Sequence, residues 1–365
     1  MICFYAIFQY ISCLVKQYLR FVHTRINEQY LHIMEYRSLG KSELKVSVIS
    51  FGAWAIGGWM WGGADDADAV EALNVAIDNG MTSIDTAPVY GFGKSERLVG
   101  KAIQGKRDKV QVLTKYGLRW DTTKGAFYFK SSDANGNDVA IHRYAGPDSI
   151  IRECEASLKR LQTDYIDLYQ IHWNDPTTPI ADTMDAVRQL KAQGKILAAG
   201  VSNYTAEQMK EANEVIDIVT NQVPYSMVLR DIEKDVVPYC LESGKGVLAY
   251  SPLQRGVLTG KITPGYTFNP GDHRPNTPYF KEPNLTRINQ FLNTIEPIAK
   301  EYNITLAQMV IYWTIQQPAI VSALVGARNA KQVLENLKAG EVHLRGEDLA
   351  AITKYLEELE LDLSV

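Results

Sequence analysis

The chain has 365 residues, of which 46% are hydrophobic and 22% charged, a balance typical of globular proteins that excludes a wholly disordered chain. Its 38 basic and 42 acidic residues give a net charge of −4, so it lacks the basic excess expected of a nucleic-acid-binding protein. The four cysteines, Cys3, Cys13, Cys154 and Cys240, form no C-x-x-C pair, which argues against a disulfide framework, a zinc site or a thioredoxin-like motif and fits a reducing cytoplasm.

The first 33 residues differ from the rest of the chain. Residues 1–15 are almost entirely apolar, yet a secretory signal would begin with basic residues, and the first basic residue is Lys16. The apolar run is also shorter than the roughly 20 residues of a membrane-spanning helix. Met34 begins a stretch typical of a soluble enzyme. We therefore expect residues 1–33 to be an extension outside the fold and Met34 to be the true start, with an interfacial membrane anchor as the alternative.

From Val46 onward, short apolar runs alternate with stretches of helical spacing. The runs typical of strands lie near residues 48, 83, 111, 167, 198, 219, 247 and 322. Helices are predicted over 65–79, 95–103, 147–161, 181–193, 206–212, 232–243, 287–302, 305–317, 329–339 and 346–360. Gly194 and Gly244 follow two of these helices, where a glycine commonly ends a helix, and Pro147 stands in a first helical turn.

Strands that alternate with helices require parallel pairing with right-handed crossovers. Eight such units over about 290 residues predict an α/β fold of the (β/α)8 TIM barrel type, formed by residues 34–365. A doubly wound sheet is the alternative, but the residues after Gly52 do not match G-x-G-x-x-G. Two long segments, 117–146 and 254–284, follow the third and seventh strands. Because active sites lie at the C-terminal ends of barrel strands, we expect both segments to border the site and the first to be mobile.

Polar side chains that could act together follow three neighbouring strands. Asp85 ends the second predicted strand, Tyr90 lies five residues further on, Lys115 ends the third strand and His172 ends the fourth. A phenol has a pKa of about 10, and we expect the Lys115 ammonium, oriented by Asp85, to lower it. Tyr90 is then predicted to donate a proton to a carbonyl oxygen that His172 polarises. A Schiff-base aldolase barrel that uses Lys115 is an alternative.

Five stretches of the sequence have close counterparts in a known family, and the match as a whole runs from about Tyr36 to the C-terminal helix. They are DTAPVYGFGKSERLVGKAI, TKYG, LKRLQTDYIDLYQIHW, KILAAGVSNY and LAYSPLQRGVLTGK. These stretches resemble the aldo-keto reductase superfamily, especially the bacterial general stress and inositol-utilisation reductases. The resemblance implies reversible, NADPH-dependent reduction of aldehydes or ketones to alcohols by a metal-free, monomeric, cytoplasmic enzyme. It implies the catalytic residues Asp85, Tyr90, Lys115 and His172.

The resemblance also implies a cofactor site in three parts. The nicotinamide end matches Trp54, Asp85, Ser202, Asn203, Gln222 and Tyr250. The pyrophosphate matches a Gly-rich stretch with two cations, formed by Ser251, Leu253, Arg255, Gly256, Leu258, Gly260 and Lys261. The adenosine end matches Gly326, Arg328, Gln332, Glu335 and Asn336. Better-known members carry a Lys-Ser pair and a further Arg in this last part, whereas this chain lacks them and keeps Arg328. Arg328 is therefore the obvious partner for a 2′-phosphate. NADPH is favoured, with NADH as the weaker alternative.

The substrate pocket is implied to contain Trp54, Tyr90, Trp120, His172 and Trp173. Trp59 and Trp61 are further candidates for its walls, although packing within a Gly-rich loop explains them equally well. The segment 117–146 carries Phe127, Tyr128, Phe129, His142 and Arg143 beside the pocket. The partner is expected to be a small carbonyl compound, with no nucleic acid and no membrane unless residues 1–33 are an anchor. A cofactor-binding regulatory subunit of the same fold is the alternative to an enzyme.

Overall fold

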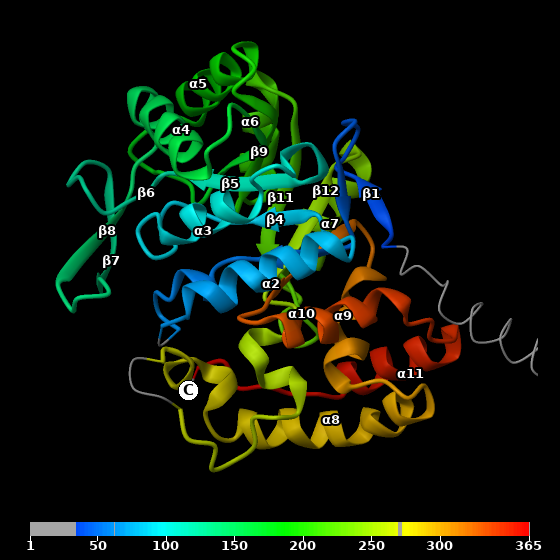
Figure 1. Cartoon of the computed structure of the whole chain (residues 1–365). Coiled ribbons are helices and arrows are strands. Elements are labelled where there is room, and N and C mark those ends of the chain that lie inside the picture. Colours follow the sequence, from blue (N-terminus) through cyan, green and yellow to red (C-terminus); the bar gives the residue numbers. More distant parts are fainter. Residues whose placement is uncertain (1–33, 62, 269–271, 365) are drawn as a thin grey trace, which may run out of the picture. The chain divides into compact units, whose positions relative to one another are not determined.

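The computed structural model describes residues 34–364, apart from residue 62 and residues 269–271. The expectations for residues 1–33 therefore lie outside the described residues. Eight parallel strands close into a barrel, each hydrogen-bonded to the next (Figure 1). In chain order they are β3 (Ile49–Gly52), β4 (Ser83–Asp85), β5 (Gln111–Tyr116), β9 (Ile166–Ile171), β10 (Ile196–Ser202), β11 (Ile218–Pro224), β12 (Gly246–Tyr250) and β13 (Ile320–Gly326). The predicted (β/α)8 fold is confirmed.

Helices connect the barrel strands and cover them from outside (Figure 1). They are α2 (Asp66–Asp78), α3 (Lys94–Ala102), α4 (Pro147–Leu161), α5 (Ile180–Ala192), α6 (Ala206–Val215), α7 (Val236–Ser243), α8 (Asn284–Glu301), α9 (Leu306–Ile315), α10 (Ala330–Leu337) and α11 (Gly346–Glu357). Several boundaries have local causes. The Asp65 side chain accepts hydrogen bonds from the first backbone N–H groups of α2, and Thr205 and Thr305 form capping boxes that start α6 and α9. Gly244 ends α7 in the left-handed region, with φ of 68°.

A short hairpin closes the N-terminal end of the barrel. It pairs β1 (Tyr36–Ser38) with β2 (Lys45–Ser47) in antiparallel register. Its Leu39 and Val46 are fully buried among side chains such as Leu113, Leu168 and Leu248 from inside the barrel. The sequence predicted a single strand near residue 48, whereas the chain divides this run at Val48 between the hairpin and β3. The barrel is therefore open only at the end where its strands have their C-termini.

The segment 117–146 is a three-stranded antiparallel sheet, which the sequence did not predict. β6 (Leu118–Arg119), β8 (Asp138–Arg143) and β7 (Ala126–Ser132) pair in that order, and β7 and β8 extend away from the barrel (Figure 1). Asp133 builds the turn between β7 and β8, because its Oδ1 accepts hydrogen bonds from the backbone N–H groups of Asn135 (2.8 Å) and Asn137 (2.9 Å). Residues 133–137, in the segment expected to be mobile, form the tight turn of this hairpin.

Two buried carboxylates hold the ends of this sheet to the barrel. Glu153 of α4 accepts a hydrogen bond from the backbone N–H of Gly117 at 3.0 Å. Asp175 accepts one from the backbone N–H of Ala145 at 2.9 Å. Arg119 of β6 also pairs with Glu153, at 3.4 Å. The sheet is thus anchored at both points where the chain enters and leaves it.

The second long segment, 254–284, contains only short 3-10 turns among its described residues: η4 (Gln254–Thr259), η5 (Arg274–Asn276) and η6 (Pro278–Phe280). It was predicted to be irregular, and it follows β12 at the C-terminal end of the barrel.

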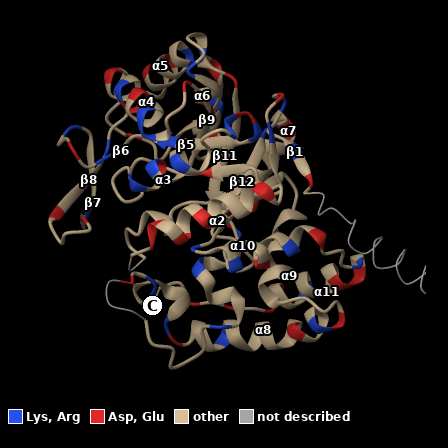
Figure 2. Cartoon of the chain, viewed as in Figure 1, with Lys and Arg blue, Asp and Glu red and all other residues tan. Residues whose placement is uncertain are grey.

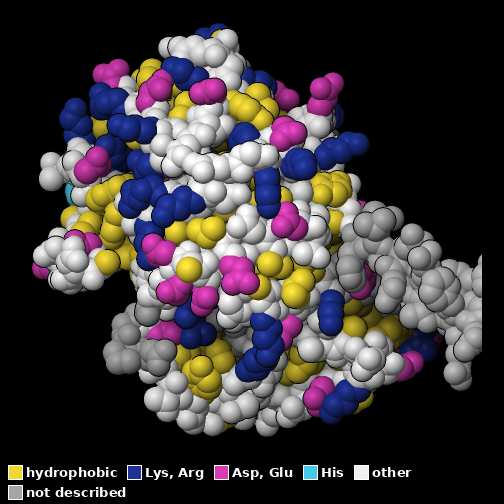
Figure 3. All heavy atoms as spheres, viewed as in Figure 1, with side chains coloured by type: hydrophobic (Ala, Val, Ile, Leu, Met, Phe, Trp, Pro, Cys, Tyr) yellow, Lys and Arg dark blue, Asp and Glu magenta, His cyan; other side chains and the backbone are white. Residues whose placement is uncertain are grey.

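No helix within the described part of the chain is long and apolar enough to cross a membrane. Positive and negative side chains are both spread over the helices and over the visible face (Figures 2 and 3).

Candidate active site

The four residues predicted to act together meet at the C-terminal end of the barrel. The Lys115 Nζ atom donates hydrogen bonds to both carboxylate oxygens of Asp85 at 2.8 Å, and to the carbonyl of Thr86 at 3.0 Å. It also lies 3.4 Å from the hydroxyl of Tyr90. The rings of Tyr90 and His172 meet edge to face, with centroids 5.7 Å apart. A phenol, an ammonium group, a carboxylate and an imidazole therefore meet at this end of the barrel.

Burial sets the protonation states of this cluster. It raises the pKa of Tyr90 well above its ordinary value, and the negative charge of Asp85 raises it further. Burial and the charge of Asp85 thus outweigh the lowering expected from Lys115, so the net shift of the Tyr90 pKa is upward. Burial and the positive charge of Lys115 lower the pKa of His172 well below its ordinary value. At neutral pH the site holds a protonated phenol and a neutral imidazole.

The residues predicted for the nicotinamide end form a hydrogen-bonded chain beside this cluster. Gln222 donates through Nε2 to Asp85 Oδ1 at 2.7 Å. Asn203 donates to the carbonyl of His172 at 3.0 Å, and its own Oδ1 accepts from the Tyr250 hydroxyl at 2.9 Å. Ser202 donates to the carbonyl of Gln222 at 2.8 Å. The structure therefore brings these side chains together, and Trp54 joins them by stacking on Tyr90, with ring centroids 5.9 Å apart.

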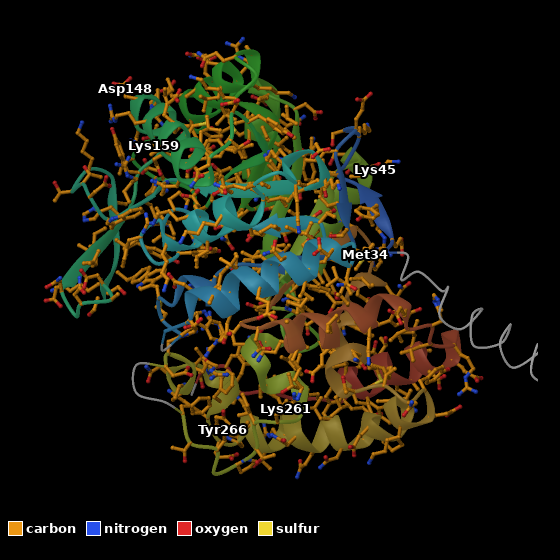
Figure 4. All side chains as sticks on the ribbon, in the orientation of Figure 1. Met34, Lys45, Asp148, Lys159, Lys261 and Tyr266 are labelled. Carbon is orange, nitrogen blue, oxygen red and sulfur yellow. The ribbon has the colours of Figure 1, made fainter. Side chains whose placement is uncertain are left out.

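The segment predicted for the pyrophosphate folds as η4 and its flanks. Arg255 and Gly256 adopt positive φ angles of 54° and 100°, which turn the backbone sharply. The Arg255 guanidinium lies 6.0 Å from the Trp54 ring centroid and has no carboxylate partner among the described residues. Leu258 is fully buried within η4, and Lys261 is exposed just after η4 (Figure 4). Ser251, Leu253 and Gly260 flank this turn.

The predicted adenosine residues lie after β13 and along the start of α10. Arg328 donates to the carbonyl of Trp61 at 3.0 Å, and its guanidinium lies 5.6 Å from the centroid of that ring. Gln332 accepts from the backbone N–H of Arg328 at 2.8 Å, and Asn336 donates to the carbonyl of Gly326 at 3.3 Å. Glu335 is half-buried, and its backbone carbonyl accepts from Gln308. Of these side chains, Arg328 is the one that offers a positive charge.

Aromatic side chains line the approach to Tyr90. Trp173 contacts Tyr128, with ring centroids 5.5 Å apart, and Trp120 contacts Phe92 at 5.3 Å. Trp59 stacks on Phe129 at 6.1 Å and donates through Nε1 to the hydroxyl of Ser131 at 2.8 Å. All of these residues except Ser131 pack in one cluster that also contains Tyr90 and Trp54. Trp120 and Trp173 thus pack in the same cluster as Tyr90, together with Tyr128 and Phe129 of segment 117–146.

The comparison with known proteins decides the family. A family model described as the aldo/keto reductase family matches residues 48–357. The chain belongs to this family. The similarity covers the whole barrel, and the four clustered residues lie within it.

Individual aldo/keto reductases are similar over nearly their whole length. The aldo-keto reductase YhdN of Bacillus subtilis (strain 168) is 40% identical over 327 residues, 89% of this chain and 94% of the relative. The NADH-specific methylglyoxal reductase of Escherichia coli (strain K12) is 35% identical over 328 residues, 88% of this chain and 98% of the relative. Among solved structures, a glycerol dehydrogenase of Gluconobacter oxydans has a TM-score of 0.79 at 37% identity, covering 89% of this chain and 95% of its own. A Klebsiella pneumoniae aldo-keto reductase in complex with NADPH has a TM-score of 0.67 at 30% identity, covering 88% and 95%.

One part of this aldo/keto reductase's site was missed from the sequence. His273 packs against Trp54 and Trp61, with ring centroids 5.7 and 5.4 Å apart, and its Nδ1 lies 2.8 Å from the carbonyl of Met60. Its neighbour Arg274 lies 5.6 Å from the ring centroid of Trp61. These residues stand in the irregular segment 254–284, where no local pattern indicates which side chain turns inward. Trp61 thus lies between His273, which contacts Trp54 at the nicotinamide end, and Arg328 at the adenosine end.

Proposed function

We propose that this chain reduces aldehydes or ketones to alcohols with NADPH, and that Asp85, Tyr90, Lys115 and His172 are its catalytic residues. The observation that carries the proposal is the buried contact between Lys115 and both Asp85 and Tyr90, with His172 against the tyrosine ring. This cluster lies at the open end of the barrel, where enzymes of this fold bind their substrates. The family to which the chain belongs supports the same reaction.

Each residue of the cluster has a distinct task in the proposed reaction. The bound dinucleotide supplies the hydride. Tyr90, protonated because of its burial, donates the proton to the substrate oxygen. The neutral His172 imidazole orients that oxygen by a hydrogen bond. The phenolate that Tyr90 leaves behind is stabilised by the Lys115 ammonium, which Asp85 holds in place at 2.8 Å.

The side chains present fit a dinucleotide with phosphate groups. Arg255 and Arg328 are partly buried guanidinium groups without carboxylate partners among the described residues, and phosphates would provide them. The positive φ of Gly256 leaves its backbone open to close approach. The indole Nε1 of Trp54 is buried and unpartnered within the described structure. Arg255 and the η4 backbone would hold the pyrophosphate, and Arg328 would hold the 2′-phosphate. The Escherichia coli relative, by contrast, is named as specific for NADH, which has no 2′-phosphate.

Replacement of Arg328 tests the preference for NADPH. Arg328→Ala removes one charge-assisted contact, worth about 1.5–3 kcal/mol, so NADPH should bind roughly 10-fold to 150-fold more weakly. The dissociation constant for NADH should hardly change, because NADH lacks the 2′-phosphate. Fluorescence titration of both cofactors measures these constants. Lys338→Ala, which removes an exposed cation just after α10, is the matched control. Equal losses for both cofactors would show that Arg328 does not recognise the 2′-phosphate.

A screen of carbonyl compounds with NADPH tests the reaction itself. Oxidation of NADPH that depends on an aldehyde or ketone is the expected result. Binding of NADPH without any turnover would instead indicate a regulatory subunit. Trapping of a substrate on Lys115 by borohydride would indicate a Schiff-base aldolase.

We propose that residues 34–365 form the whole catalytic unit, and that it acts as a monomer in the cytoplasm. The exposed large apolar side chains of the described residues are scattered over separate elements, which supports a monomer. The buried free thiols of Cys154 and Cys240 fit a reducing compartment. A chain that begins at Met34 should melt within a few degrees of the full chain and keep its turnover. A large fall in melting temperature would show that residues 1–33 stabilise the barrel.

A further inference from the structure

Strand β8 turns one row of its side chains toward the active site. Val139 and Ile141 pack in the same apolar cluster as Tyr90. Because side chains alternate along a strand, Arg143 belongs to the same row. His142 belongs to the other row and contacts Phe127, with ring centroids 5.8 Å apart. The Arg143 side chain therefore leaves the backbone on the side of the site.

The Arg143 guanidinium lacks an ionic partner. Its Nε is buried without a hydrogen-bond partner in the described structure, and its Cζ lies 5.2 Å from the centroid of the Tyr128 ring. An arginine keeps its charge at any physiological pH, and a buried charge is unfavourable unless it is paired. Among the described arginines, only Arg143, Arg255 and Arg328 are partly buried without a carboxylate at ion-pair distance. The last two face the proposed phosphates, so Arg143 is left with no anion.

Tyr128 connects this guanidinium to the reacting centre. Its ring contacts Trp173, which directly follows His172 in the chain, at a centroid distance of 5.5 Å. Tyr128 also packs in the cluster that contains Tyr90 and Trp54. Tyr128 therefore lies close to the nicotinamide end of the site. A substrate whose carbonyl carbon lies beside Tyr90 can extend its other end along this aromatic wall toward Arg143.

We propose that Arg143 binds an anionic group of the substrate, a carboxylate or a phosphate, so that this site prefers carbonyl compounds that carry a negative charge. The planar guanidinium can form paired hydrogen bonds with either group. Tyr128 stacks on the guanidinium and keeps it oriented. The proposal rests on the proposed function, because it assigns the substrate class of the same site.

Matched aldehydes measure the preference for charge. 4-Carboxybenzaldehyde and 4-formylphenyl phosphate carry the anion, whereas methyl 4-formylbenzoate and benzaldehyde are neutral. The wild-type protein should reduce at least one anionic aldehyde with a KM well below that of the neutral ester. Arg143→Met should raise the KM for the anionic aldehydes roughly 10-fold to 150-fold, the range for one charge-assisted hydrogen bond. The kinetic constants for the neutral aldehydes should stay within about twofold.

Two further variants separate recognition from damage to the fold. Lys130→Met removes an exposed cation from the same hairpin and should leave all four aldehydes unaffected. Arg143→Lys keeps the charge and should retain part of the preference. Calorimetric titration of the NADP+-saturated protein with 4-methylbenzoate, which has no reacting carbonyl, adds a readout independent of turnover. Its binding should weaken in Arg143→Met, with the melting temperature unchanged.

Different results overturn the two proposals. If benzaldehyde is reduced but the anionic aldehydes gain no advantage in the wild type, Arg143 is not an anion site and the proposed function stands. If Arg143→Met keeps the preference, the anion is held elsewhere and the assignment to Arg143 is wrong. If no aldehyde oxidises NADPH, the proposed function fails. In that case, binding of 4-methylbenzoate that Arg143→Met leaves unchanged would also refute the anion site.

Discussion

Tyr90→Phe should lower kcat for aldehyde reduction by about 10²-fold to 10⁴-fold, the usual contribution of a general acid. The phenylalanine ring keeps the stacking on Trp54 and the contact with His172 but cannot donate the proton. NADPH affinity should hardly change, because the proposed phosphate contacts lie elsewhere. Single-turnover hydride transfer to a good aldehyde measures the loss without interference from product release. Transfer within threefold of the wild-type rate would show that Tyr90 is not the donor.

Tyr116→Phe is the matched control for this experiment. Tyr116 is also fully buried, but its hydroxyl has no hydrogen-bond partner in the described structure. Removal of the Tyr116 hydroxyl should therefore leave kcat and the melting temperature close to their wild-type values.

The raised pKa of Tyr90 also predicts a pH dependence. Reduction needs the protonated phenol and should show no decline near pH 10, the ordinary pKa of tyrosine, whereas alcohol oxidation needs the phenolate and should rise with pH.

Lys115→Met should cost about as much activity by a different route. Tyr90 remains, but its phenolate loses the ammonium 3.4 Å away, so its pKa rises further. The alkaline rise in alcohol oxidation should therefore move to higher pH. The variant should also be less stable, since removal of one partner from a buried ion pair typically costs about 3–5 kcal/mol. Kinetics over a pH series and chemical denaturation measure the two effects.

A double variant separates the loss of charge from the loss of stability. Lys115→Met leaves the buried Asp85 with Gln222 as its hydrogen-bond donor. Asp85→Asn introduced together with Lys115→Met removes the unpaired charge, so part of the stability should return while activity stays low. Recovery of turnover in the double variant would contradict the role assigned to Lys115.

The barrel and the cluster at its open end could be predicted because their causes are local. Each barrel strand is an apolar run between turn residues, and the ends of neighbouring parallel strands must meet at one edge. Asp85 ends β4, Lys115 is the last residue but one of β5, His172 directly follows β9, and Tyr90 lies five residues after β4. The positions of these residues therefore followed from strand order alone.

Features that depend on distant contacts were not predictable in this way. A register shift between Phe127 and Phe129 breaks the alternation of β7, so its pattern does not indicate a strand. The inward position of His273 depends on Trp54 and Trp61, more than 200 residues earlier in the chain. The raised pKa of Tyr90 depends on how deeply the finished fold buries it. Sequence patterns describe none of these surroundings.

The way the sheet of residues 117–146 is anchored has an evolutionary consequence. Its strands pair only with one another, and two carboxylates, Glu153 and Asp175, hold its two ends. Mutations and changes of length between these anchors can therefore accumulate without disturbing the strands that carry Lys115 and His172. Related barrels could exchange this sheet as a unit and acquire new substrates while inheriting the same chemistry. Grafting the segment onto a relative that lacks it would show how readily a lineage can diversify in this way.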